Sequence, residues 1–370
     1  MDPRLAASVT PLAYQAAFEV PEEDEAHTIE EMLKSLKHIS TTTFEDSGHA
    51  LRSVHAKSHG ILRGTLTVLD SLPPAYAQGL FAQPGSYEVV ARLSTTPGDI
   101  LDDKVSTPRG MAVKIVGVAG ERVDGSEQDT TQDFVMVNGP AFAAPTAKKF
   151  SANLKLLAPT TDKAPKLKVA LSAVLRGAEK ALEAVGGESA TLKSLGGHPA
   201  TNPLGETYFT QAPILYGAYM AKVSLAPISP GLTALTDAPV ELHDTHDGLR
   251  EAIKAHFAQD GGEWELRVQL CTDIEKMPIE DSSVEWPQEE SPYVAVARLC
   301  MAPQAGWSEA LSKLVDDGMR FNPWHALAAH RPIGSIMRVR KAAYAMSSAF
   351  RFERSGVQQV EPRDLNAWPK

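Results

Sequence analysis

Three residues near the end of the chain have the types and spacing to hold a ligand against one face of a helix. Arg340, Tyr344 and Arg351 lie at positions i, i+4 and i+11, which share one side of a 3.6-residue helical turn. A phenol ionises near pH ~10, so a phenolate at neutral pH needs a cation or a metal ion beside it. The spacing favours either an anionic tyrosine ligand for iron or an exposed basic stripe that carries one tyrosine.

Two segments around these residues resemble the proximal signature of haem catalases. One is Arg340-Lys-Ala-Ala-Tyr344 with Arg351 seven residues later, which is similar to Arg-x-x-x-Tyr-(x)6-Arg. The other is Phe321-Asn-Pro323, which is similar to the family's Ala-Phe-Asn-Pro segment. The resemblance implies that Tyr344 ligates the iron of ferric haem b, that Arg340 stabilises its phenolate and that Arg351 pairs with a haem propionate.

Three motifs earlier in the chain resemble the same family, in the family's order. They are Arg52-Ser-Val-His-Ala-Lys57, Ala91-Arg-Leu-Ser-Thr95 and Pro108-Arg-Gly-Met-Ala-Val-Lys114. The resemblance makes His55 the distal acid–base residue and Ser94 the hydrogen-bond partner that holds it. It also makes Arg52 and Arg92 propionate partners and places Val54 against the cofactor.

Asn138 and Phe150 complete the implied site, although the chain departs from the family around Asn138. The family has a run like Asp-x-Val-Gly-Asn-Asn-Thr-Pro, whereas this chain has Asp133-Phe-Val-Met-Val-Asn-Gly-Pro140. Without gaps, the catalytic asparagine falls on Val137, and a shift of one residue reverses the face of a strand. Asn138 is expected to orient the peroxide only if a β-bulge restores its direction. Phe150 has the offset of the phenylalanine that stacks on the haem.

The resemblance implies a haem-dependent peroxidase or catalase that acts on hydrogen peroxide or organic hydroperoxides. A neutral His55 would move a proton from one peroxide oxygen to the other, which gives heterolytic O–O cleavage and a ferryl intermediate. A second peroxide or an organic electron donor would reduce that intermediate. One alternative is a hydroperoxide-rearranging enzyme of the allene oxide synthase type, in which a threonine stands at the position of Val54. The other is a non-catalytic carrier of haem or a lipophile, which Val137 favours.

The elements that must position these residues are mainly short strands. Runs rich in β-branched residues occupy 62–69, 87–94, 111–118, 133–138, 212–226, 263–271 and 293–301. Helices are expected at 21–38, 165–185, 248–259, 307–317 and Ser335–Ser355, and residues 1–20 are expected to be loosely ordered. Because helices and strands do not alternate, we expect an α+β fold: an antiparallel, catalase-like β-barrel with flanking helices and a C-terminal haem-ligating helix.

We expect a single domain over residues 1–370. It would consist of an N-terminal helical arm (1–50), the barrel with inserted helices (51–300) and a C-terminal helical region with the proximal ligand (301–370).

The composition excludes several classes of partner. Lysine and arginine number 36 against 46 acidic residues, a net charge of −10, which argues against a nucleic-acid surface. No apolar run of about 18 residues indicates a membrane span, and the start lacks the pattern of a signal peptide. Cys271 and Cys300 have no CxxC partner, so a disulfide framework is not expected. These features favour a cytoplasmic enzyme, and the family resemblance implies a homo-oligomer.

Overall fold

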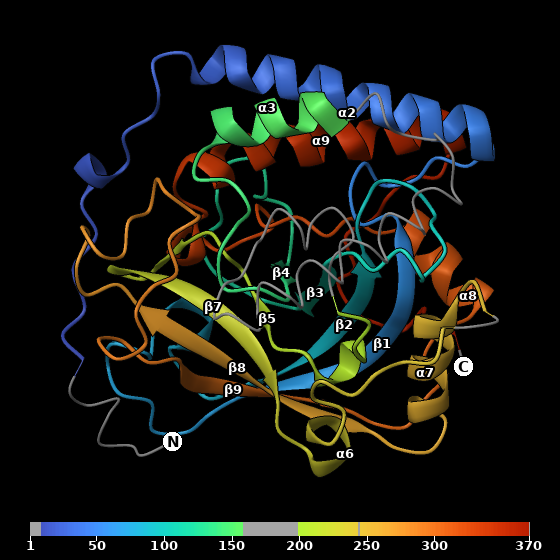
Figure 1. Cartoon of the computed structure of the whole chain (residues 1–370). Coiled ribbons are helices and arrows are strands. Elements are labelled where there is room, and N and C mark those ends of the chain that lie inside the picture. Colours follow the sequence, from blue (N-terminus) through green and yellow to red (C-terminus); the bar gives the residue numbers. More distant parts are fainter. Residues whose placement is uncertain (1–8, 158–198, 243–244, 370) are drawn as a thin grey trace, which may run out of the picture.

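Eight antiparallel strands close into a β-barrel, and a ninth strand pairs onto it (Figure 1). The computed structural model describes residues 9–157, 199–242 and 245–369. Within these residues the strands are β1 (Lys57–Val68), β2 (Ser86–Thr95), β3 (Arg109–Val116), β4 (Thr131–Val137), β5 (Tyr208–Phe209), β6 (Ile214–Tyr216), β7 (Tyr219–Pro227), β8 (Gly262–Leu270) and β9 (Val294–Met301). The order is β5–β4–β3–β2–β1–β9–β8–β7–β6, and pairing of β5 with β7 closes the barrel.

The predicted antiparallel barrel is confirmed, and each predicted strand coincides with an observed one. β1 begins at Lys57 rather than at residue 62, and its pairing with β2 shifts register between Ser58 and Gly60. The run 212–226 divides into β6 and β7 at Gly217, whose φ of 61° allows the tight turn between them. The predicted helix at 165–185 lies outside the described residues.

Alternation along β2 separates an apolar inner face from a polar outer one. Val89, Ala91 and Leu93 lie in the main core of the barrel. Because successive side chains of a strand point to opposite faces, Arg92 and Ser94 lie on the outer face. The polar residues predicted to form the site are therefore placed outside the barrel.

Three helices are stacked on this side of the barrel, with α9 between α2 and the sheet (Figure 1). Elsewhere the described residues form the α-helices α6 (Pro230–Thr233), α7 (Gly248–Phe257) and α8 (Glu309–Ser312), and the three stacked helices are α2 (Glu25–Ser47), α3 (Ala147–Leu157) and α9 (Ser335–Ser355). Their shared apolar contact is made by Met32, Leu36, Ile39, Ala147, Leu154 and Val339. Because this contact joins α2 and α3 to α9, it fixes α9 in place over the sheet.

The long C-terminal helix is confirmed over Ser335–Ser355, and other helix predictions need correction. The first helix begins at Glu25 and continues to Ser47, beyond the predicted end at residue 38. The helix predicted at 307–317 is α8 followed by a π-helical turn, η5 (Lys313–Asp317). α3 was not predicted.

The expectation of loose order at the N-terminus is wrong for residues 9–20. The amides of Leu12 and Tyr14 donate hydrogen bonds to the carbonyls of Cys271 and Ala218, and both side chains pack against a buried apolar cluster. Among the described helices, we find none with the length and apolarity that a bilayer span requires.

The two glycines that flank α9 give a matched test of how the helix is held. A Cβ on Gly334, whose φ is 85°, would lie 2.0 Å from the Ile279 carbonyl oxygen, whereas a Cβ on Gly356, at φ 67°, meets nothing within 4 Å. We expect Gly334→Ala to lower the free energy of unfolding by about 3 kcal/mol and Gly356→Ala by about 1 kcal/mol. Urea unfolding followed by circular dichroism measures both, and equal losses would contradict the placement of Gly334.

Candidate functional site

The distal motif at 52–57 and helix α9, almost 300 residues apart in the chain, meet outside the barrel. The Ser53 amide donates to Ser347 Oγ at 3.3 Å. Arg52 and Arg351 each donate through Nη1 to the Asp316 carbonyl oxygen, at 2.9 and 2.6 Å. Since Ser347 lies about one helical turn after Tyr344, the structure brings the loop that carries His55 against the part of α9 that carries Tyr344.

His55 is held by β2 and β3. Its Nδ1 lies 3.2 Å from Ser94 Oγ, the pair expected from the sequence. A Cβ on Gly110 would lie only 2.7 Å from His55 Cε1, so a residue without a side chain is needed for the ring to lie against β3. His55 itself has a φ of 54°, which is uncommon for a residue with a side chain and accompanies functional positions more often than others.

The surroundings of His55 keep its imidazole neutral. Burial is the main cause, and the positive charges of Arg92 and Arg340 add to it, lowering the pKa of His55 to about 3. The ring is therefore uncharged at physiological pH and able to accept a proton. Arg340 of α9 thus lies close enough to His55 for its charge to act on the ring.

Asn138 lies just beyond the end of β4, and its side chain is bound to β3. Its Oδ1 accepts a hydrogen bond from the Arg109 amide at 2.9 Å. β3 and β4 pair without a register shift up to Val137, so the bulge on which the assignment of Asn138 depended is not present in β4. Val137 keeps the outer-face position expected from alternation, and the role of Asn138 stays a prediction.

On the proximal side, Tyr344 shares its face of α9 with Arg340. Burial raises the pKa of the Tyr344 phenol, the Arg340 charge opposes that shift, and Asp133 adds to it. No hydrogen bond joins the two residues: the Arg340 guanidinium lies over the Phe142 ring, 5.4 Å from its centroid. The protein alone therefore keeps the phenol protonated, and a bound cation is needed to ionise it.

Phe150 and Val54 are apolar residues on two different elements, α3 and the loop of His55. Phe150, on α3, packs edge-on against Phe142, with ring centroids 5.1 Å apart. Val54, beside His55, is 41% exposed, a large fraction for an apolar side chain. The contacts predicted for them with a cofactor stay predictions.

The three arginines predicted to bind propionates converge on one residue that the sequence analysis did not identify. Asp316 Oδ1 accepts hydrogen bonds from Arg92 Nε at 2.6 Å and Arg52 Nη1 at 3.1 Å, and the Asp316 carbonyl binds Arg351. We call these four residues the arginine cluster. Mutual repulsion and burial lower the pKa of Arg52 well below its usual range and that of Arg351 to about 10.

The sequence did contain a signal for Asp316. Asp316 and Asp317 come at the end of a helical segment, where the helix dipole favours cations rather than carboxylates. The structure resolves this conflict because Arg52 also binds the carbonyls of Val315 and Met319, which lie at the same end. The arginine cluster thus supplies the cations that the end of this helix lacks.

The residues present fit a ferric haem. A phenol oxygen on α9 and an imidazole on the facing loop are the donor set that haem iron and a peroxide require. The carboxylate of Asp316 binds the guanidinium groups of Arg52 and Arg92, while Arg351 binds only backbone oxygens, so the arginine cluster suits an added anionic group. Tyr344 would hold the iron, and Arg52, Arg92 and Arg351 would hold the propionates.

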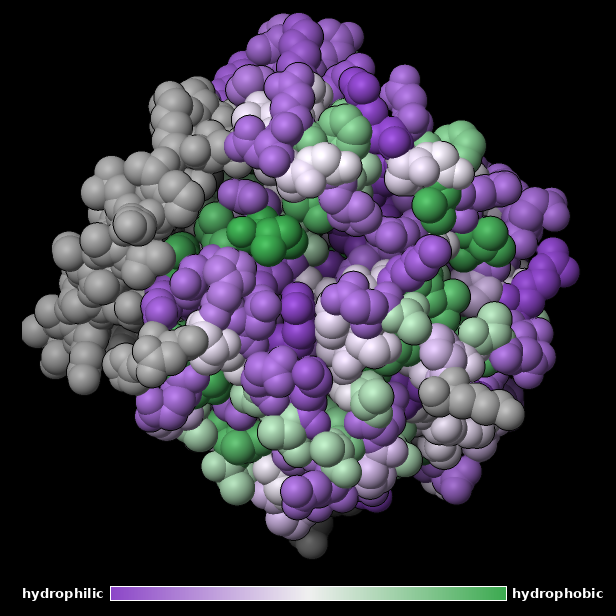
Figure 2. Space-filling view, turned by 90° about the vertical axis from the view of Figure 1, so that its right-hand side faces the viewer, coloured by the Kyte–Doolittle hydropathy of each residue, from purple (hydrophilic) through white to green (hydrophobic). Residues whose placement is uncertain are grey.

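A pocket of about 400 Å³ reaches the arginine cluster from outside. Arg52 and Asp316 form part of its wall, between the C-terminal end of α2 and α8. These elements lie at the right of Figure 1, the side that Figure 2 presents, where hydrophilic residues predominate around small hydrophobic patches. Because they line this pocket, the side chains of Arg52 and Asp316 are 13% and 14% exposed to solvent.

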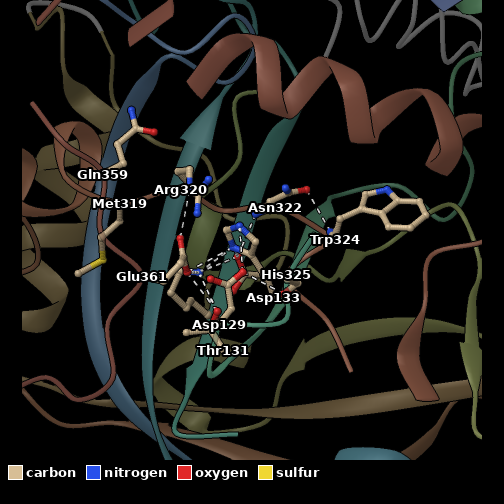
Figure 3. Close-up of polar contacts among 12 residues, drawn as sticks. Asp129, Thr131, Asp133, Met319, Arg320, Asn322, Trp324, His325, Gln359 and Glu361 are labelled. Carbon is tan, nitrogen blue, oxygen red and sulfur yellow. Dashed lines mark hydrogen bonds and ion pairs between the residues drawn. The ribbon is translucent and has the colours of Figure 1, made fainter. Parts of the chain in front are cut away.

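A second buried charge network lies on β3 and β4 and was also missed (Figure 3). Asp133, His325 and Glu361 come close enough to hold a metal ion. Lys114 Nζ already lies among them, 2.8 Å from both oxygens of Asp133, 3.3 Å from His325 Nδ1 and in contact with Glu361. An ammonium group therefore takes the place that a cation would need, and the network joins β3 and β4 to the C-terminal segment.

Titration of His55 tests the electrostatic link between the two sides of the site. With a pKa of about 3, its ring proton shifts should stay constant from about pH 5 to about pH 8, unlike those of a free imidazole. Arg340→Met should raise the pKa of His55 because one of the charges that lowers it is lost. Lys341→Met removes a charge that is adjacent in sequence but exposed, and it should leave the pKa of His55 unchanged. NMR titration assigned with a His55→Gln variant measures this, and a midpoint near 6.5 in the unmodified protein would contradict the placement.

Lys114 should be essential to folding. Lys114→Met leaves Asp133 and Glu361 buried without their cation, which we expect to cost about 4 kcal/mol of unfolding free energy. Lys148→Met, which removes an exposed partner of Asp24, is the control and should leave the urea midpoint unchanged. Equal midpoints for the two variants would show that the network does not stabilise the fold.

Comparison with known proteins agrees with the architecture. No family model matches the sequence, and no curated protein matches it. Solved structures do resemble it. A fungal catalase is 16% identical, with 90% of this chain and 70% of that chain covered and a TM-score of 0.58. Catalase A from Saccharomyces cerevisiae is 15% identical, with 84% of this chain and 63% of that chain covered and a TM-score of 0.57, and a bacterial catalase is 16% identical, with 92% and 63% covered and a TM-score of 0.55. The closed antiparallel barrel with its flanking helices is a catalase-like fold.

Proposed function

We propose that the protein is a haem-dependent peroxidase or catalase that decomposes hydrogen peroxide or organic hydroperoxides. The observation that carries the proposal is the meeting of two distant motifs. The His55–Ser94 pair lies on one side, and the Tyr344–Arg340 pair lies on the other, joined through Ser53 and Ser347. The catalase-like fold supports the same reading, at the level of fold alone.

His55 is the residue that moves protons in this proposal. Its imidazole is neutral because its pKa is about 3. If Nδ1 carries the ring proton and donates it to Ser94 Oγ, then Nε2 is the basic nitrogen. Nε2 takes a proton from one peroxide oxygen and returns it to the other, which leaves as water. Ser94 and Gly110 fix the ring, so that this exchange needs no movement of the histidine.

The remaining residues hold the cofactor. Ferric haem b, when bound, supplies a redox-active iron at which the peroxide bond is cleaved. Tyr344 would hold the iron through its phenolate, and Arg340 would stabilise that charge. The electrons for a complete cycle would come from a second peroxide or from a small organic donor.

A carrier of haem without turnover is the second candidate. It is favoured by Asn138, whose side-chain oxygen is bound to the Arg109 amide, and by Val137 on the outer face of β4. An enzyme that relied on Asn138 to orient peroxide would need that amide group to turn toward the site.

Haem binding tests the proposed ligand. Tyr344→Phe should lose most of the haem and its Soret absorbance after reconstitution, because a phenyl ring cannot ligate iron. Tyr87→Phe, a tyrosine of β2, is the control and should bind haem like the unmodified protein. Retention of full haem content and an unchanged spectrum by Tyr344→Phe would rule out this tyrosine as the ligand.

Turnover separates the enzyme from the carrier. His55→Ala should keep its haem but decompose peroxide at least ~100-fold more slowly, since the group that moves the proton is gone. His49→Ala, an exposed histidine, should keep full activity. Oxygen evolution from hydrogen peroxide measures the catalase reaction, and oxidation of a phenolic donor measures the peroxidase reaction. A haem-loaded, unmodified protein with neither activity would favour the carrier.

A further inference from the structure

The arginine cluster carries more positive than negative charge. Arg52, Arg92 and Arg351 are guanidinium groups that stay ionised in proteins, and Asp316 supplies one negative charge among them. Asp317, the next residue, pairs with His49 at 3.0 Å on a more exposed surface, and its charge acts on Arg52 and Arg351 from outside the cluster. The cluster is therefore short of about two negative charges, and burial makes such a shortage costly.

The cluster also has hydrogen-bonding capacity left over. Nε of Arg351, a residue with only 5% of its surface exposed, is buried without a hydrogen-bond partner. Its Nη1 and Nη2 are directed to carbonyl oxygens at Asp316 and Met319. A buried N–H of a charged group without a partner is rare in folded proteins and marks a place for an acceptor.

We propose that Asp316 is a fixed counter-ion within this cluster. With Asp316 in place, the cluster keeps a surplus of two positive charges and therefore binds a ligand with two carboxylates. It holds this ligand less tightly than the three arginines would without Asp316. The inference rests on the proposed function, in which the two carboxylates are the propionates of haem b. Asp316 is thus a residue that sets how fast the cofactor is released, without contacting the iron.

Asp316 is held too firmly to be displaced by such a ligand. Its Oδ2 accepts hydrogen bonds from Ser58 Oγ at 2.6 Å and Ser312 Oγ at 2.7 Å, while its Oδ1 binds Arg52 and Arg92. The arginines hold it ionised, since they lower its pKa far below its usual range. Its charge is therefore present at physiological pH, and it acts as a constant repulsion rather than as a switch.

The isosteric variant Asp316→Asn isolates the charge. The amide oxygen can still accept from the two arginines, and the amide nitrogen can donate to the serine hydroxyls. The arginines also keep their carbonyl partners at Ala56, Val315 and Met319. The variant thus removes one negative charge from the cluster with little change in its geometry.

The experiment measures how fast haem leaves the full chain. Unmodified protein and Asp316→Asn are loaded with haem b or with haem dimethyl ester, whose carboxylates carry no charge, and release is followed by transfer to excess apomyoglobin. We expect haem b to leave Asp316→Asn about tenfold more slowly, because one repelling charge is gone. The diester should leave both proteins at the same rate. Glu309→Gln, on α8 but outside the cluster, is the control and should change neither rate.

Release of haem b from Asp316→Asn as fast as, or faster than, from the unmodified protein would overturn the inference. If Asp316→Asn does not fold, Arg92→Gln gives the opposite test: it reduces the surplus charge, so haem b should leave faster while the diester is unaffected. An equal effect on both haems would also overturn it. If the unmodified protein binds neither haem, the proposed function itself fails and the inference falls with it. If the protein binds haem but Asp316→Asn does not slow the release of haem b, only the inference about Asp316 fails.

Discussion

Two backbone oxygens link the two halves of the site. The carbonyls of Asp316 and Met319 each accept hydrogen bonds from Arg52, which begins the loop of His55, and from Arg351, in the last turns of α9. Arginines reach across the gap because their planar groups bind several oxygens at once. Together with the contact of Ser53 with Ser347, these carbonyls join the loop of His55 to the helix of Tyr344.

The same arrangement explains the electrostatics of the site. Burial, aided by the positive charges of Arg92 and Arg340, keeps the His55 imidazole neutral. Cations around a buried phenol favour its ionisation, but burial outweighs them in this structure. In the proposed function, the site would combine a neutral base with a tyrosine that a bound metal ion ionises.

Sequence reasoning predicted the barrel and the positions of its strands because alternation and turn residues are local signals. It also predicted the His55–Ser94 pair, which β2 and the distal loop bring to 3.2 Å. It missed Asp316 and the Lys114–Asp133–Glu361 network. Each depends on partners from distant segments, and a lone charged residue in a sequence is usually solvated. The direction of the Asn138 side chain could not be predicted for a similar reason, because the geometry at the end of a strand depends on the segments packed against it.

Resonance Raman spectroscopy of the haem-loaded protein tests the central claim most directly, because it reports which atom binds the iron. With Tyr344 as the ligand, we expect vibrations of an iron-bound phenolate that shift when the protein is grown with isotopically labelled tyrosine. A spectrum of histidine or water ligation, with no shift from labelled tyrosine, would contradict it.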